Sequence, residues 1–221
     1  MKQLLLTLIA PLLALSCGLA GAQQSSGGSN LEAAGKLAAI LRDTRTLSAD
    51  VQQLTLDQDG REIQEFQARL VLSKPNHVYW EITSPYSEYL IADGERIWRF
   101  EPDLEQVTVE DFSEDLNRTP VLLLNGEADA IAESYTVSAA DMDFGARQRF
   151  ILTPKTPDSL FERLSFTFNG KALEEMQFQD SLGQKTSLNF SELEMNAEID
   201  PGIFVFDMPE GMEIIDNTSG Q

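Results

Sequence analysis

The amino-acid sequence predicts a mainly β protein. We expect a single curled antiparallel sheet of about ten or eleven strands that forms an incomplete β-barrel, with helices as a lid over an apolar cavity. Three observations predict this class. Apolar residues recur with a period of two along most of the chain, turn signals arrive about every 8–12 residues, and only short segments have helical spacing. A sheet of about ten strands curls or closes, because flat open sheets of that size are unusual.

The first segment has the features of a secretion signal. Residues 1–22 begin with a lysine-containing start, continue through an apolar stretch and end in the small residues Ala20-Gly21-Ala22. The apolar stretch is shorter than the roughly 20 residues that span a bilayer. We therefore expect cleavage of a signal peptide, and a mature chain, residues 23–221, that forms a single periplasmic or secreted domain.

Cys17 keeps an alternative open. A bacterial lipid-attachment signal has a leucine-type residue three positions before its cysteine, and this chain has Ala14 there, with Leu15 one place too late. The pattern favours cleavage after Ala22, and a lipidated Cys17 is the alternative.

A polar lead-in precedes the first helix. Residues 23–29, with the sequence QQSSGGS, have the composition of a flexible linker. Ser29 and Glu32 have the spacing of a capping box, and apolar residues then recur at helical spacing. These features predict an amphipathic helix over residues 30–44.

The apolar period then changes to two, which is typical of strands with one apolar face. Turn dipeptides separate the runs, as in an antiparallel meander. The clearest runs are residues 66–72, 78–82, 98–100, 166–168, 176–178 and 188–190, and the turns are Asp59-Gly60, Asp93-Gly94, Asn169-Gly170 and Leu182-Gly183.

One helical interruption is predicted over residues 113–134. Thr119-Pro120 combines a good N-cap with a proline at the first helical position, and Asn125-Gly126 supplies a stop. Residues 127–133 have the pattern of a second short helix. Because these helices are too few to cover both faces of the sheet, we expect them to cap one mouth of the barrel.

Composition excludes several function classes. The chain has 16 Lys and Arg against 36 Asp and Glu, a formal charge of −20 that is unsuited to a nucleic-acid surface. One cysteine and one histidine cannot form a Cys/His zinc site. The sequence also lacks a phosphate-binding glycine loop and the motifs of hydrolases and zinc proteases. We expect no enzymatic activity, no metal and no cofactor, and we interpret His77 as a surface histidine of a strand.

Carboxylate clusters leave a glycan-binding or hydrolytic β-protein as a further alternative. A glycosidase needs two carboxylates across a cleft, and close pairs such as Asp103 and Glu105 are frequent in a chain this acidic. We interpret these clusters as solvated surface.

A series of short motifs resembles the periplasmic outer-membrane lipoprotein carriers, the LolA family. No single motif is specific to this family, but the order of the motifs across residues 45–216 is specific to it. The motifs are LSKPNHVYW at 72–80, SP at 84–85, LIADG at 90–94, IWRF at 97–100, PDLEQVT at 102–108, TP at 119–120 with Leu122 and Leu123, LTPK at 152–155, DSLGQ at 180–184, FVF at 204–206 and PEG at 209–211.

The resemblance implies a periplasmic chaperone of protein transport in outer-membrane biogenesis. Such a carrier takes acylated lipoproteins from an inner-membrane lipoprotein-releasing ABC transporter, shields their acyl chains, and passes them to an outer-membrane lipoprotein acceptor. We expect a monomer. The alternatives within the same fold are the lipid-anchored acceptor itself and a stress-signalling sensor with an added domain, against which the chain length argues.

The resemblance also implies an acyl-binding site on inward-facing strand residues and on the lid. We predict that the lid uses Leu37 and Leu41 of the first helix with Leu122 and Leu123 of the middle one. The predicted wall consists of Leu70, Leu72, Val78, Trp80, Leu90, Trp98 and Phe100.

One position departs from the family pattern. The family usually has an arginine before the proline of the KPN motif, where it latches the lid through several hydrogen bonds. This chain has Lys74, a point charge without the planar fork of arginine. The latch is therefore either weaker here or made by other residues.

Overall fold

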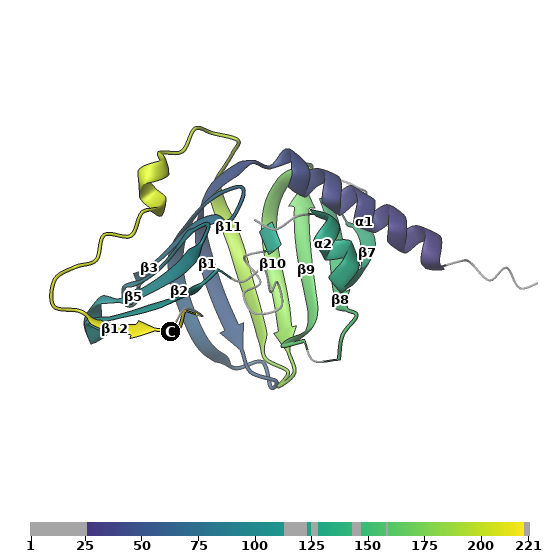
Figure 1. Cartoon of the computed structure of the whole chain (residues 1–221). Coiled ribbons are helices and arrows are strands. Elements are labelled where there is room, and N and C mark those ends of the chain that lie inside the picture. The colour runs from purple at the N-terminus through teal and green to yellow at the C-terminus, as the bar shows by residue number, and fades with distance from the viewer. Residues whose placement is uncertain (1–25, 113–122, 125–127, 143–146, 158, 219–221) are drawn as a thin grey trace, which may run out of the picture.

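In the part of the chain that the structure describes, twelve strands form one sheet, with β12 at one end and β7 at the other. The sheet curls so that α1 and α2 lie over one end of it, and the barrel stays open (Figure 1). The predicted incomplete, curled barrel is confirmed. The computed structural model describes residues 26–112, 123–124, 128–142, 147–157 and 159–218.

One helix precedes a first block of strands, and a second helix separates that block from a second one, as the predicted helical interruption implies. The elements are α1 Ser26–Asp43, β1 Thr46–Leu56, β2 Glu62–Ser73, β3 His77–Ser84, β4 Glu88–Asp93, β5 Arg96–Glu101, η1 Pro102–Leu104, β6 Gln106–Asp111, α2 Ala128–Ser134, β7 Tyr135–Met142, β8 Arg147–Pro154, β9 Phe161–Asn169, β10 Ala172–Asp180, β11 Lys185–Met195, η4 Pro201–Phe204 and β12 Glu213–Asp216.

The strand order is β12-β6-β5-β4-β3-β2-β1-β11-β10-β9-β8-β7. Neighbours are antiparallel, except that β12 pairs in parallel with β6. The pairing of β1 with β11 joins an N-terminal and a C-terminal meander into one surface. All four residues of β12 are exposed, so this strand has no alternating pattern by which the sequence could reveal it.

The predicted hairpin turns are confirmed, and Gly94 shows why a glycine is needed. Its φ angle of +98° lies in a region that residues with a side chain rarely adopt, and a Cβ atom at this position would lie 3.4 Å from the ring of His77. The adjacent Asp93 carboxylate accepts the backbone N–H groups of Glu95 and Arg96. Burial opposes ionisation of Asp93, but these hydrogen bonds outweigh it and hold the pKa of the carboxyl below its usual value.

The two helices agree with the prediction in type but not in every boundary. Helix α1 begins at Ser26, so Ser29 lies inside the helix rather than at its N-cap. Once a helix is nucleated, each further residue adds one hydrogen bond, which lets it extend back into the polar lead-in. Helix α2 confirms the second short helix. The predictions for residues 1–22, Cys17, Thr119-Pro120 and Leu122 lie outside the described residues.

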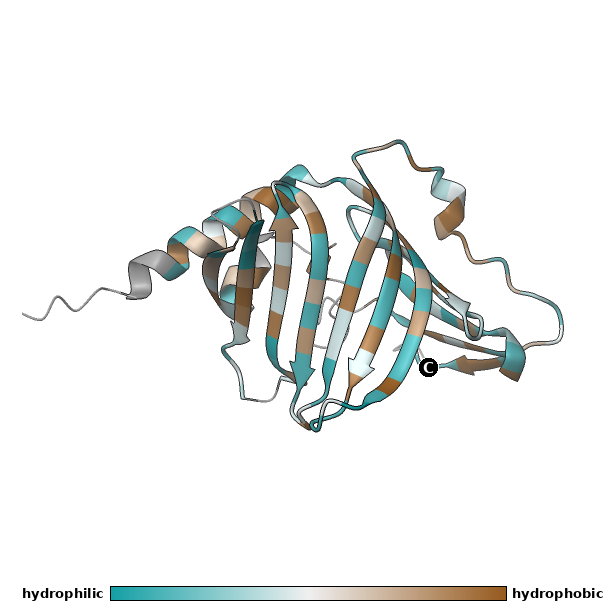
Figure 2. Ribbon diagram, turned by 180° about the vertical axis from the view of Figure 1, so that it is seen from behind, coloured by the Kyte–Doolittle hydropathy of each residue, from teal (hydrophilic) through white to brown (hydrophobic). Residues whose placement is uncertain are grey.

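The inner face of the curled sheet carries the main hydrophobic core. Figure 2 shows apolar and polar residues alternating along the strands, as expected when one face is buried. The side chains of Phe150, Leu164 and Phe166 on this face are fully buried. Helix α1 packs on the same core through Leu37 and Leu41.

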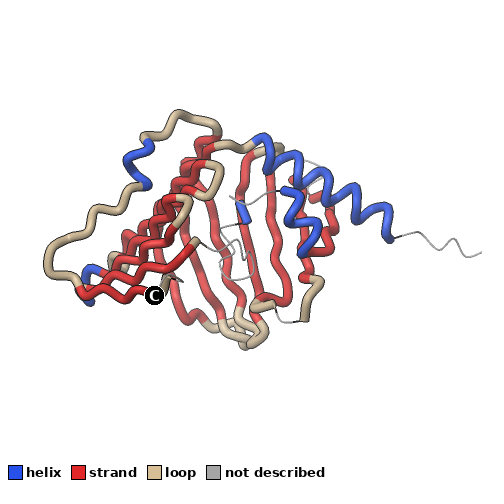
Figure 3. Tube along the Cα trace, viewed as in Figure 1, coloured by secondary structure: helices blue, strands red, loops and turns tan. Residues whose placement is uncertain are grey.

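A second, smaller apolar layer lies on the outer face of β2–β6. The buried residues Val71, Ile91, Val107 and Val109 belong to it and are separate from the main core. Residues 201–216, which we call the C-terminal strap, run beside these strands and end in β12 (Figure 3). The strap therefore covers an apolar surface on the side of the sheet away from the helices.

Phe206 anchors the strap. Its ring stacks on Trp98 with a centroid separation of 5.3 Å and lies 5.9 Å from Phe100.

Replacing Phe206 with alanine should loosen the strap and cost about 1–3 kcal/mol of folding free energy, because the partly exposed ring loses both its burial and its aromatic contacts. In a Trp80→Phe background Trp98 is the one remaining tryptophan. Adding Phe206→Ala to this background should shift the fluorescence emission of Trp98 to the red, because the ring becomes more exposed to water. Unchanged emission and stability would contradict the anchoring role.

Candidate functional site

Five of the seven predicted wall residues lie together on the inner face. The register places Leu70 opposite Trp80, and Leu72 opposite Val78. Trp80 in turn faces Leu90 on β4. Directly opposed residues share one face of a sheet, so these side chains form two rows across β2, β3 and β4.

The prediction that Trp98 and Phe100 share this face is wrong. Trp98 pairs with Ile91, and Phe100 pairs with Tyr89. Leu90, between those partners, points inward, so Trp98 and Phe100 point outward. There they pack under the C-terminal strap.

The inner-face residues differ in how far they are covered. Leu70 and Leu72 are 0% exposed and belong to the packed core. Trp80 remains partly exposed, with its ring edge-on to Phe66 at 6.2 Å between centroids. A ligand could therefore reach Trp80 without displacing the core.

Further half-buried aromatics on the inner face extend this surface. Phe178 and Phe190 pack against the main core from β10 and β11 but are not enclosed by it. Phe178 contacts Phe161 edge-on at 5.1 Å. The period-two runs at 176–178 and 188–190 contain both residues, but the residues carrying the resemblance lie elsewhere, so sequence reasoning left them out of the site. Trp80, Phe178 and Phe190 lie on three strands of this one inner face, and we call this set of partly exposed residues the open aromatic surface.

The lid residues that the structure describes pack against the hydrophobic core. Leu37, Leu41 and Leu123 are buried, and Leu124 beside Leu123 is buried as well. Helices α1 and α2 contact each other and the edge strand β7. The described lid is therefore closed over the β7 end of the inner face.

Lys74 ties the lid helix to the sheet. Its Nζ donates to the carbonyl oxygen of Leu41 at 2.7 Å, in the last turn of α1, where a positive charge also complements the helix dipole. Its backbone N–H donates to the carbonyl of Arg45 at 2.9 Å. Desolvation lowers the pKa of the Lys74 ammonium from its ordinary value. A second lysine, Lys155, makes the same kind of bond to Ala132 in α2, with 2.7 Å between Nζ and the carbonyl oxygen.

Replacing Lys74 with methionine should loosen α1. The loss of a hydrogen bond from a charged donor costs about 1.5 kcal/mol, so opening of the helix should rise about tenfold. Native-state hydrogen exchange of the α1 amides measures this. Lys155→Met is the matched control, because it removes the same bond from α2 and should leave the exchange of α1 unchanged. Equal protection of α1 in the wild-type and Lys74→Met proteins would contradict the latch.

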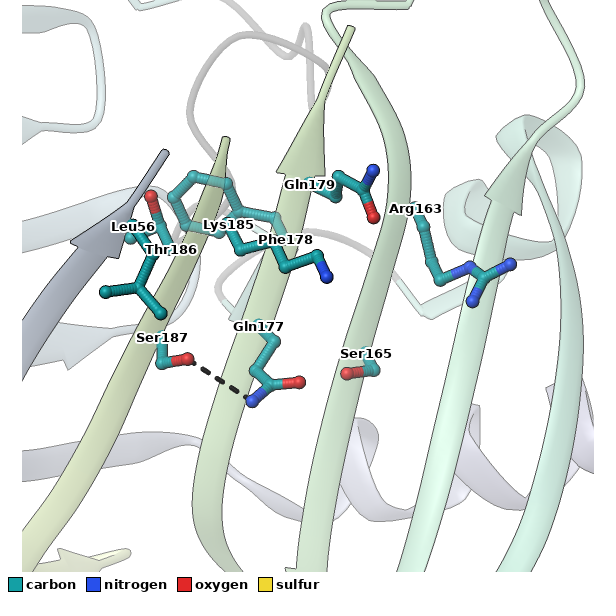
Figure 4. A pocket seen from close by; sticks show the side chains of 9 residues that line it. All are labelled: Leu56, Arg163, Ser165, Gln177, Phe178, Gln179, Lys185, Thr186 and Ser187. Carbon is teal, nitrogen blue, oxygen red and sulfur yellow. Dashed lines mark hydrogen bonds between the residues drawn. The ribbon is translucent and has the colours of Figure 1, made fainter. Parts of the chain in front are cut away.

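The hollows on the outer face are polar. One of about 310 Å³ lies over β9, β10 and β11 and is shown in Figure 4. Arg163, Gln179 and Lys185 stand in one row across these strands. In the next row the side-chain amide of Gln177 donates to the Ser187 hydroxyl at 3.2 Å. Such a lining suits water or polar groups rather than an apolar ligand.

The His, Cys, Asp and Glu side chains of the described residues do not gather in groups of three or more that could hold a metal ion. Among the described helices, none is long and apolar enough to cross a bilayer. His77 begins β3 and is partly exposed, in agreement with its interpretation as a surface histidine of a strand, and its ring lies 5.4 Å from that of Phe204 in the strap.

A family profile and named relatives of this chain agree on the family that it resembles. The profile of the family described as outer membrane lipoprotein carrier protein LolA matches residues 42–207. A Chromohalobacter salexigens protein named outer-membrane lipoprotein carrier protein is 41% identical over 194 residues, covering 88% of this chain and 89% of that protein. A Pseudomonas aeruginosa protein of the same name is 36% identical over 213 residues, covering 96% of this chain and 99% of that protein.

A solved structure shares the fold. An uncharacterized conserved protein from Thermus thermophilus superposes with a TM-score of 0.51 at 11% identity, and the match covers 84% of this chain and 98% of that one. At this identity the likeness concerns the fold alone.

Proposed function

Because the chain belongs to the LolA family of outer-membrane lipoprotein carrier proteins, we propose that it carries lipoproteins by holding their acyl chains on the inner face of its open sheet. The observation that carries this proposal is the open aromatic surface. Trp80, Phe178 and Phe190 remain partly exposed beside an otherwise buried apolar face. Large aromatic side chains in that position suit an apolar ligand better than water.

Acyl chains require such a carrier. Each buried CH₂ group gains about 0.8 kcal/mol, so several long chains keep a lipoprotein in its membrane unless another apolar surface accepts them. The carrier must also release its cargo. A lid that opens at some free-energy cost weakens net binding by that cost. The Lys74 bond to α1 gives the closed lid a modest, reversible advantage.

The route of the cargo follows from the family. The carrier accepts acylated lipoproteins from an inner-membrane ABC transporter and delivers them to an outer-membrane acceptor, crossing the periplasm as a monomer. A formal charge of −20 suits basic docking surfaces on both partners and repels anionic headgroups. Export through the signal at residues 1–22 would place it in that compartment. The relatives named as carriers favour this role over the anchored acceptor, and a mature N-terminus at Gln23 would support it.

The function is tested by displacement of bis-ANS, a dye that reports apolar cavities, from the exported protein. A triacylated lipopeptide should displace the dye in a saturable manner, and the same peptide without acyl chains should not. Displacement by neither peptide would contradict the carrier function. Displacement by both to the same extent would show that the peptide rather than the acyl chain is bound, which also contradicts it.

A further inference from the structure

The inner face changes from apolar to polar between β4 and β5. One row of directly opposed residues crosses five strands and reads Leu70, Trp80, Leu90, Arg99 and Thr108. The next row towards the β3–β4 turn contains Ile82 and Glu88. The apolar wall described above therefore ends at a polar margin on the same face. Adjacent strands are about 4.8 Å apart, so Arg99 lies about 10 Å from Trp80.

Arg99 and Glu88 form an ion pair at this margin. The Arg99 guanidinium lies 3.2 Å from the Glu88 carboxylate, and the two side chains are 40% and 21% exposed. The pair is accessible enough to meet a ligand, and Glu88 holds the guanidinium in place. Glu88 accepts a hydrogen bond from one guanidinium nitrogen of Arg99, and a guanidinium has five N–H donors in all, so the group can bind a further acceptor while it stays paired with Glu88.

The acylated N-terminus of a lipoprotein changes from apolar to polar along its length, as the inner face does between β4 and β5. Its hydrocarbon chains are apolar along their length and join at ester and amide carbonyl groups, which accept hydrogen bonds but carry no charge. A guanidinium presents several donors in one plane and suits a cluster of such oxygens better than a single point charge does. Chains lying on Trp80 would place their carbonyl groups next to the polar margin.

We propose that Arg99, positioned by Glu88, binds the ester and amide carbonyl oxygens at the root of the acyl chains and thereby sets the orientation of the cargo. This inference rests on the proposed carrier function and adds a polar subsite to it. Arg99 determines specificity for acyl groups linked through carbonyls, and the open aromatic surface supplies affinity for hydrocarbon of any linkage.

The test compares two lipopeptides in the bis-ANS displacement assay. One carries two palmitoyl esters and an N-palmitoyl amide on its S-glyceryl cysteine, and the other carries hexadecyl ethers in place of the two esters. The exported wild-type protein should bind the ester form about tenfold more tightly, as expected for hydrogen bonds from a charged donor. Arg99→Met should lose this preference, because the ester form binds much more weakly, whereas the ether form, which keeps only the amide carbonyl, is weakened less.

Arg69→Met is the matched control. Arg69 lies on β2 beside Leu70 but points to the outer face, where the register sets it opposite Glu81. Its replacement by methionine removes one positive charge, as Arg99→Met does. This variant should keep the wild-type preference for esters. Arg99→Gln serves as a second variant that keeps a polar side chain, in case Arg99→Met does not fold.

The outcomes separate this proposal from the function on which it rests. If the wild-type protein binds neither lipopeptide, the carrier function itself is contradicted. If it binds both with equal affinity, or if the Arg99 variants weaken both to the same extent, the carrier function stands and the role of Arg99 is overturned. Loss of the ester preference in the Arg99 variants, and not in Arg69→Met, is the result that we expect.

Discussion

Replacing Trp80 with glutamate is expected to abolish binding of acylated peptides while the sheet remains folded. Trp80 lies in the apolar inner row between Leu70 and Leu90 and is partly exposed. A carboxylate can therefore be hydrated there in the empty protein. Bound acyl chains would remove that water and leave the charge without a partner, which costs several kcal/mol and lowers affinity by at least about a hundredfold.

Thr83→Glu is the control for this variant. Thr83 lies on the same strand, β3, but is exposed on the outer face, so it introduces the same charge without entering the proposed site. Binding of the triacylated lipopeptide should survive this change. Far-UV circular dichroism verifies that both variants are folded. Near-normal binding by a folded Trp80→Glu protein would remove Trp80 from the site.

The largest loss of stability is expected for Phe166→Ala. Phe166 is 0% exposed, and the register places it between Phe150 on β8 and Met176 on β10. Truncating a buried phenylalanine leaves a cavity and typically costs about 3–5 kcal/mol. Domains of this kind are stable by about 5–15 kcal/mol in total, so the variant should unfold at a much lower urea concentration.

Phe178→Ala supplies the comparison on the same face. Its ring is only partly buried and belongs to the open aromatic surface, so the loss of stability should be smaller, whereas acyl binding should weaken. Urea unfolding measures the first effect and dye displacement measures the second. Equal destabilisation by the two substitutions would show that Phe178 is a core residue and would remove it from the proposed site.

Strand positions were predictable because periodicity and turn chemistry are local. The runs around Phe66, Val78 and Leu188 all lie inside strands, and Gly94 adopts the positive φ that its turn requires. The side of the sheet that each run faces was not equally predictable. Alternation relates residues within one strand, whereas the relation between strands depends on register.

Trp98 illustrates this limit. Its run resembles that of Trp80, but the register turns it to the other face, where Phe206 covers it from a segment far along the chain. No local pattern indicates that a C-terminal strap would bury an outer face. The bond from Lys74 to Leu41 is equally non-local, since it joins the end of a helix to the end of β2. The resemblance left open whether Lys74 forms a weaker latch or other residues form it, and in the structure the Lys74 side chain makes one hydrogen bond to the lid helix.

The proposal that acyl chains lie on the inner face is tested most directly by the two tryptophans, which stand on opposite faces of the sheet. In Trp98→Phe the emission comes from Trp80, and in Trp80→Phe it comes from Trp98. Titration with the triacylated lipopeptide should change Trp80 emission in a saturable manner and leave Trp98 emission unchanged. A saturable change at Trp98 with none at Trp80 would place the ligand on the outer face and contradict the account.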